Sequence, residues 1–143
     1  MATVSLRQAE AIVDGTLSAA RAAEAKPVAV VVLDHAGHVV AAKREDGATM
    51  FRYDIALGKA WGAAAFGVSS RALVQKAQEN PNFMLSLTNA ATGRILPNPG
   101  GLPIFDVEGK LLGAVGVSGD SGDRDEAFAA AGVENAQLSS TAS

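Results

Sequence analysis

The chain of 143 residues contains no cysteine, only two histidines and no long apolar run. Without cysteine it forms neither disulfides nor thiolate-ligated zinc or iron–sulfur sites. The longest strictly apolar run, Val28–Leu33, is far too short to cross a bilayer, so we expect no membrane partner. The N-terminus carries Arg7 and Glu10 and no apolar signal core, which predicts a cytoplasmic location.

The chain also has fewer basic than acidic residues. Twelve Lys and Arg side chains stand against 15 Asp and Glu, for a net charge of −3, so nucleic acid is not an expected partner. With 48% hydrophobic and 19% charged residues the composition is that of a globular protein. A chain of this length is expected to form one domain that buries roughly two-thirds of its unfolded surface.

The stretch from Val28 to Lys43 predicts a β-hairpin. Val28–Leu33 is apolar and rich in β-branched residues, which favours a central strand covered on both faces. Asp34 and Gly37 occupy the first and last positions of a type I turn. The next strand, His38–Lys43, follows too closely for a crossover connection, so the two strands are expected to be antiparallel.

Capping signals and apolar spacing predict four helices. They run from Ser5 to about Ala25, from Phe51 or Arg52 to Phe66, from Ser69 or Ser70 to about Gln78, and from Asp123 to about Gly132. Pro81 is expected to close the third helix, and Phe83–Leu87 fits either a strand or a short helix.

A second pair of strands is expected at Gly100–Phe105 and Leu111–Ser118, around a turn at Glu108–Lys110. Gly113 and Gly116 interrupt the second of these strands, which indicates a bulge or the close approach of a helix or ligand. The element order is therefore α-β-β-α-α-β-β-α. Hairpins in place of βαβ units predict an α+β fold, an antiparallel sheet with helices packed on it.

Two histidines, His35 and His38, flank the first turn and are the candidates for a metal or haem site. Together with Asp34 they could supply metal ligands or one axial haem ligand. The other interpretation is a pair of exposed turn residues. Two ligands from one tight turn need a further chain or a prosthetic group to complete a site.

Cationic residues after the hairpin are the candidates for binding an anion. Lys43 and Arg44 could clamp a carboxylate, with Asp46 either acting as a base or pairing with them. Lys59 lies on a helix face of small residues. Its stem packs there while the ammonium reaches water, or the ammonium is buried or faces a ligand. In a purely structural account, Arg44 and Lys59 pair with Asp46 and Asp54.

Three motifs resemble the GlcG-like, haem-degrading family, which includes the C-terminal domain fused to some cobalamin adenosyltransferases. They are the D-x-x-G hairpin followed by R-x-D-G-A at 44–48, I-A-x-x-K-A at 55–60, and G-G-x-P-I at 100–104 with G-A-x-G-V-S-G at 113–119. The resemblance covers about Leu6 to Gly132. It implies a single GlcG-like domain at residues 1–134 and leaves 135–143 as a polar, flexible tail.

The resemblance implies a profilin-like antiparallel sheet of about five strands, flanked by helices, and a symmetric homo-oligomer. Some family members bind haem or other tetrapyrroles, and some are described as haem-degrading. One haem-binding relative uses a histidine on its first helix. This chain has no histidine within residues 5–25, so only His35 and His38 could replace it.

Two functions are compatible with these residues. The first is a binding protein for haem, another tetrapyrrole or a small organic acid, accessory to a catabolic pathway. Its ligand site is predicted at charged residues and glycines of the three motifs, namely Arg44, Asp46, Gly47, Lys59, Gly100 and Gly101. The second is a cofactor-independent isomerase, lyase or hydrolase acting on an organic acid, in a pocket near a subunit interface. Arg44, Asp46, Lys59 and the Gly100–Gly101 loop would line that pocket, and the sequence does not identify the catalytic residues.

Overall fold

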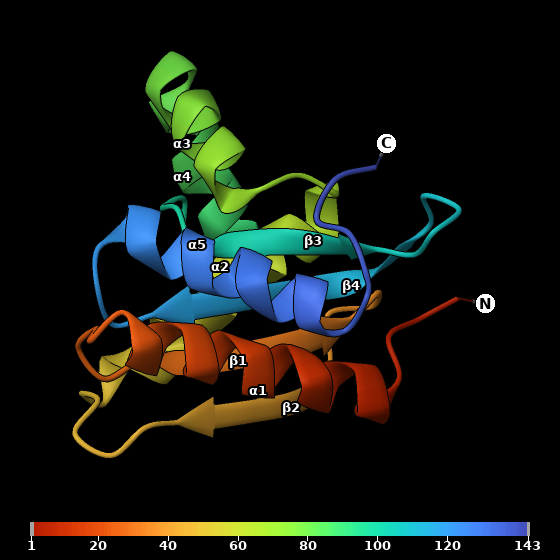
Figure 1. The fold of residues 1–143 in the computed structure, drawn as a ribbon. Helices are drawn as coiled ribbons and strands as arrows, with labels where there is room; N and C mark the ends of the chain where they lie inside the picture. The colour runs from red at the N-terminus through yellow and green to blue at the C-terminus, as the bar shows by residue number, and fades with distance from the viewer. Residues whose placement is uncertain (1, 143) are drawn as a thin grey trace.

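The protein, described here by a computed structural model for residues 2–142, is built on one antiparallel sheet with helices on both faces (Figure 1). The strand order across the sheet is β2-β1-β4-β3. The strands are β1 at Ala29–Asp34, β2 at Val39–Arg44, β3 at Gly101–Phe105 and β4 at Leu111–Ser118. The expected α+β class and antiparallel sheet are confirmed, with four strands in the described part of the chain.

Five helices surround this sheet in the described residues. They are α1 at Leu6–Ala22, α2 at Phe51–Phe66, α3 at Ser70–Glu79, α4 at Pro81–Ala90 and α5 at Gly122–Asn135. α1 and α5 pack against each other on one face, and α2 covers the other face. α3 and α4 project from the body beside β3 (Figure 1). None of the helices in residues 2–142 has the length and apolar character that crossing a membrane requires.

The central strand β1 divides the core into two layers. Val30 and Val32 pack with residues of α1 and α5, whereas Val31 and Leu33 pack with the alanines of α2. Every residue from Val28 to Leu33 is fully buried. The prediction of a central strand covered on both faces is therefore confirmed, because only an apolar run tolerates burial on both sides.

The segment left open between strand and helix is helical. Asn80 accepts a hydrogen bond from the backbone N–H of Phe83, and Pro81 takes the first helical position of α4. Proline is tolerated there because its missing N–H has no intrahelical partner. The predicted element order therefore lacked one helix, and Pro81 opens α4 besides ending α3.

Helix ends follow the caps, with one correction at α5. Ser5 and Gln8 form the expected reciprocal capping box at α1. The cap of α5 is Ser121, whose Oγ accepts from the N–H of Arg124 at 3.3 Å, so the predicted start at Asp123 is two residues late. α5 also continues past the predicted end at Gly132.

Gly132 has a packing role inside α5. A Cβ at Gly132 would collide with Oγ1 of Thr16 on α1. A Cβ at Gly15 would lie 2.5 Å from Cβ of Asn135, in the same interface. These glycines allow the backbones of α1 and α5 to approach closely. That contact explains the presence of a glycine in the middle of α1, which the sequence alone leaves without a reason.

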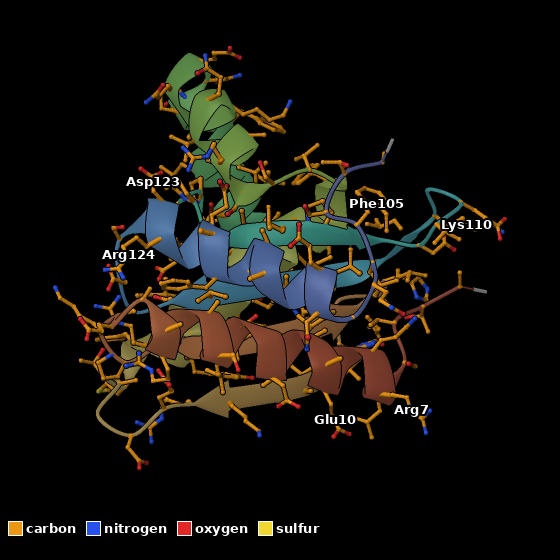
Figure 2. All side chains as sticks on the ribbon, in the orientation of Figure 1. Arg7, Glu10, Phe105, Lys110, Asp123 and Arg124 are labelled. Carbon is orange, nitrogen blue, oxygen red and sulfur yellow. The ribbon has the colours of Figure 1, made fainter. Side chains whose placement is uncertain are left out.

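The segment after α5 returns to the sheet. Ser139 exchanges two backbone hydrogen bonds with Phe105 at the edge of β3, of 2.7 and 3.0 Å. Figure 2 shows Phe105 beside this C-terminal segment. The predicted flexible tail is thus docked as far as Ser139, because the edge of β3 offers unpaired backbone groups.

Candidate functional site

The segments predicted to form the ligand site lie at one end of the sheet. Arg44 on β2 pairs with Ala29 on β1, and Ala29 pairs with Ser118 on β4. Gly100 continues this row, since its carbonyl accepts from the N–H of Val117 at 3.0 Å. Three strand spacings of about 4.8 Å separate the two ends of the row by about 14 Å. The structure therefore divides the predicted site into two parts.

The Lys59 part is a packed interior. Lys59 is 1% exposed, and its Nζ donates to Val117 O at 2.9 Å and to Oδ2 of Asp125 at 3.3 Å. Desolvation lowers the pKa of the Lys59 ammonium, and the nearby Asp125 carboxylate opposes that shift. Of the alternatives for Lys59, the buried ammonium is the one observed. Its partner is Asp125 and not Asp54.

Gly100 and Gly101 make room for α2. A Cβ at Gly100 would lie 2.8 Å from Nζ of Lys59, and one at Gly101 would collide with the Lys59 carbonyl. The N–H of Gly101 donates to Oγ of Ser70 at 2.8 Å. Both glycines are buried, so in this structure they contact protein atoms.

The Arg44 part borders an open cleft of about 440 Å³ between the end of α1 and the exit of β2. Its lining residues are Leu17, Arg21, Pro27, Lys43, Arg44, Glu45 and Asp46. A smaller cavity of about 160 Å³ continues along the same strand and shares Lys43. It is lined by Leu6, Glu10, Val13, Asp14, Ala41, Ala42 and Lys43. We call the two together the α1–β2 groove; Glu10, on α1, is labelled in Figure 2.

Glu45 fixes one end of the groove. Its Oε1 accepts the backbone N–H of Val28 at 2.9 Å, and its Oε2 lies 2.9 Å from Nε of Arg21. Arg21 also donates to the Lys26 carbonyl at 3.0 Å. Arg21 and Glu45 therefore neutralise each other and tie the end of α1 to the loop that follows β2.

Lys43 and Arg44 keep most of their hydrogen-bonding capacity. Nη1 of Arg44 donates to the Ala48 carbonyl at 2.9 Å, and this is its one hydrogen bond among the described residues. A guanidinium carries five N–H donors, so four are not used. The Lys43 side chain has no hydrogen bond or ion pair within residues 2–142, although its backbone pairs with Val30 in the sheet. With Asp46 exposed beside them, these two cations leave the groove able to bind a carboxylate.

Gly47 lies directly after this set and does not line the cleft. Its φ is +86°, a left-handed conformation that favours glycine. It thereby lets the chain turn from β2 toward α2 while Arg44 and Asp46 stay at the cleft.

The two histidines lie at the opposite end of β2. Asp34 Oδ1 accepts the backbone N–H groups of Ala36 and His38, both at 2.9 Å, and so closes the turn. The His38 side chain is 81% exposed, with Nδ1 3.8 Å from Asp34 Oδ2. Desolvation raises the pKa of Asp34, but the N–H groups of His38 and Ala36 outweigh it, so the pKa lies below its ordinary value.

This turn is not a metal site built from protein groups alone. Within residues 2–142, no group of three or more His, Asp or Glu side chains is placed to hold an ion. The six residues of β2 separate the turn from the cleft by about 20 Å, at about 3.3 Å per residue. The structure therefore does not bring His35 and His38 together with Arg44.

Sequence reasoning missed Arg21 and Asp125. Arg21 follows Leu17 by four residues and so lies on the same side of α1, a spacing that places both at the groove. Asp125 lies in the first turn of α5, and its burial against Lys59 joins residues 66 positions apart. No local signal in the sequence reports such a long-range pair.

The comparison with protein families matches residues 4–134 to the HbpS-like family, described as haem degrading proteins. The chain belongs to this family. The match covers the hairpin, α2 and the β3–β4 segment, and it confirms the family resemblance noted from the three motifs.

Relatives agree with this assignment. An uncharacterised 15.0 kDa protein of Citrobacter freundii, encoded between dhaT and dhaS, is 34% identical over 135 residues, covering 87% of this chain and 93% of the relative. The ORFY protein of Klebsiella pneumoniae has a TM-score of 0.86 at 26% identity, with 96% and 92% of the two chains covered. A double mutant of HbpS from Streptomyces reticuli has a TM-score of 0.81 at 28% identity, with 94% and 87% covered.

A structure of PduOC in complex with haem shares the fold. It has a TM-score of 0.86 at 22% identity, and the alignment covers 97% of this chain and 99% of that one. At this identity the comparison shows a shared fold over nearly the whole of both chains, and the haem-related description comes from the family model that matches residues 4–134.

Proposed function

We propose that this member of the HbpS-like family binds the carboxylate groups of a tetrapyrrole or small organic acid in the α1–β2 groove. The observation that carries the proposal is that Lys43 and Arg44, which both have unused N–H donors, line the same cleft of about 440 Å³. Binding pockets for small molecules typically have volumes of roughly 300–1,000 Å³, so the cleft has an appropriate size.

The lining supports an organic anion. Leu17 and Pro27 give the cleft an apolar part, on which a ring or chain can lie. Arg44 offers a planar fork that matches a carboxylate, while Lys43 offers a mobile point charge. Because Arg21 and Glu45 neutralise each other, the net charge of the cleft comes from Lys43, Arg44 and the exposed Asp46. That sum is positive, in a chain whose net charge is −3, and because the smaller cavity adds Glu10 and Asp14, the anion is expected in the larger cleft of the groove.

The other residues predicted for the ligand site do not line the cleft, and we propose that they hold its walls in place. Lys59, Gly100 and Gly101 hold the end of β4 against α2, beside the start of β1. The start of β1 is in turn fixed to Glu45 through the N–H of Val28. Gly47 gives the loop its turn. On this proposal they position the groove and do not contact the ligand.

The test is a calorimetric titration of protoporphyrin IX, its dimethyl ester and a panel of small dicarboxylates. We expect the free acid to bind, and the ester, which lacks carboxylates, to bind at least 10-fold more weakly. Lys43→Ala and Arg44→Ala should each weaken binding of the acids by about 10-fold, which corresponds to ~1.4 kcal/mol.

Lys110→Ala is the matched control. Lys110 is exposed near the β3–β4 turn, away from the groove (Figure 2), so its removal changes net charge equally without touching the site. If neither acid nor ester binds, or if the Lys43, Arg44 and Lys110 variants behave alike, the proposed site is wrong.

We further propose that the chain acts as a cytoplasmic homo-oligomer accessory to a catabolic pathway. Support for association comes from the large exposed side chains of Met50, Phe51 and Tyr53 at the start of α2. The pathway role is carried over from the family resemblance noted from the three motifs. Native mass spectrometry at micromolar concentration should show an oligomer, and a monomer alone would contradict it.

A further inference from the structure

We infer that the α1–β2 groove holds its ligand through carboxylate contacts alone, with no bond from the protein to a metal. A metal-free tetrapyrrole or another organic acid would then bind as well as haem does. The inference deepens the proposed function and depends on it. It follows from which atoms line the groove and from where the two histidines are.

The lining residues do not fit an iron-ligated haem. Haem iron in proteins is held by His, Cys, Met or Tyr side chains. Both cavities of the groove are lined by aliphatic, proline, carboxylate and cationic residues, and none of those four ligand types is among them. Glu45, the least exposed carboxylate of the larger cleft, already accepts from Val28 N–H and Arg21.

The histidine turn cannot supply the missing ligand to a molecule bound in the groove. His38 precedes β2 and Arg44 ends it, a separation of about 20 Å along the strand. This distance exceeds the span from the iron of one haem to its own propionates. A single haem held by Arg44 therefore has its iron far from His35 and His38.

The turn also packs toward the other face of the sheet. A Cβ at Gly37 would lie 2.8 Å from Nε1 of Trp61, so the turn contacts α2, whereas α1 forms the groove on the opposite face. Asp34 Oδ1 fixes the turn through the N–H groups of Ala36 and His38. A large movement of the histidines toward the groove would break these contacts.

The groups that remain at the larger cleft of the groove are suited to carboxylates, whereas Glu10 and Asp14 line the smaller cavity. Lys43 is shared by both cavities, and Arg44 lies beside it in the larger one. Lys43, whose strand partner Val30 faces α1, can bind one acid group of a flat ligand while its ring lies on Leu17 and Pro27, and Arg44, the last residue of β2, can bind a second acid group from the rim of the cleft. None of these contacts distinguishes a ring that carries iron from one that does not.

The test compares haemin with protoporphyrin IX on the full chain, by fluorescence quenching for the free porphyrin and absorbance for haemin. We expect the two dissociation constants to agree within about threefold. His35→Ala/His38→Ala should leave both unchanged and should not alter the Soret band of bound haemin. Lys43→Ala/Arg44→Ala should weaken both ligands by a similar factor of 10 or more.

The inference is overturned if haemin binds at least 10-fold more tightly than protoporphyrin IX. It is also overturned if the histidine variant loses haemin while keeping protoporphyrin IX, since the turn would then be an iron site. With either result, carboxylate binding at the groove still stands if the Lys43→Ala/Arg44→Ala variant binds protoporphyrin IX more weakly than the wild type. Failure of every porphyrin and dicarboxylate to bind is a different result, which rejects the proposed function itself.

Discussion

Nζ of Lys59 lies 3.3 Å from Oδ2 of Asp125, and both side chains are almost completely excluded from solvent. The pair joins α2 to the first turn of α5, and the same ammonium donates to the Val117 carbonyl at the end of β4. The other carboxylate oxygen accepts from the N–H of Asp120 at 3.0 Å. Three elements of the fold therefore meet at one buried ion pair.

Lys59→Met should destabilise the protein strongly, because it leaves the Asp125 carboxylate buried without its cation. Breaking one partner of a buried pair typically costs about 3–5 kcal/mol in the free energy of unfolding. Adding Asp125→Asn should recover much of this loss, since Asn keeps an oxygen acceptor for Asp120 N–H and carries no charge. Urea unfolding of both single variants and the double variant measures the coupling, and additive effects would contradict it.

Gly116→Val should also destabilise, because α2 occupies the space above Gly116. A Cβ there would collide with the Ala56 carbonyl, and Ala60 N lies 2.8 Å away. Overpacking of this kind typically costs roughly 1–3 kcal/mol, and a backbone obstacle leaves little room for relief. Ala42→Val on the exposed strand β2 is the control and should change the melting temperature little. Equal melting temperatures for the two variants would disprove the close contact.

Much of the fold could be predicted because its signals are local. The apolar run of β1, the Ser5 capping box and the left-handed Gly67 cap each report an element by its own residues. For Gly116 of β4, the close helix was one of the predicted alternatives and is observed, whereas Gly113 faces the backbone of Leu33 on β1. α4 was left open between a strand and a short helix because a short apolar segment fits two periods equally well, and its decisive signal is the Asn80 cap.

The candidate site was harder to predict because it depends on contacts between distant residues. Arg44 and Asp46 were placed at a cleft, but Lys59 and the Gly100–Gly101 pair pack into the interior. A lysine on a small-residue face looks the same in sequence whether an external anion or an internal carboxylate faces it. Asp125 decides the matter, and only the tertiary structure brings it to Lys59.

The Asp34 turn should contribute to stability in a pH-dependent way. Desolvation raises the pKa of Asp34, yet backbone hydrogen bonds from His38 and Ala36 bring it below the ordinary 3.8. A folded-state pKa below the unfolded one means that the ionised form stabilises the fold. The contribution is complete above about pH 3.8 and is lost as the pH falls through the lower folded-state value.

Asp34→Asn isolates this effect, since the amide oxygen can still accept the two N–H groups but does not titrate. We expect the wild type to be more stable than the variant at pH 6 and the difference to shrink below about pH 4. Thermal melts of both proteins across pH 3–6 provide the measurement. A difference that stays constant with pH would show that the charge of Asp34 does not matter.

Glu45 should have opposite effects on stability and on ligand affinity. Its Oε1 satisfies the N–H of Val28, which is fully buried, and its Oε2 neutralises Arg21. Glu45→Ala leaves that N–H without a partner and should lower the free energy of unfolding by about 1–3 kcal/mol. Glu45→Gln retains an acceptor for Val28 and should lower the free energy of unfolding by less.

Both changes at Glu45 also release Arg21 from its carboxylate, so the groove becomes more positive. Affinity for protoporphyrin IX should therefore rise severalfold at low salt and return toward the wild-type value at about 1 M salt, where charges are screened within about 3 Å. Titration of Glu45→Gln at both salt concentrations checks this. If its affinity falls although its melting temperature is kept, Glu45 holds the ligand site in shape and its charge does not oppose the anion.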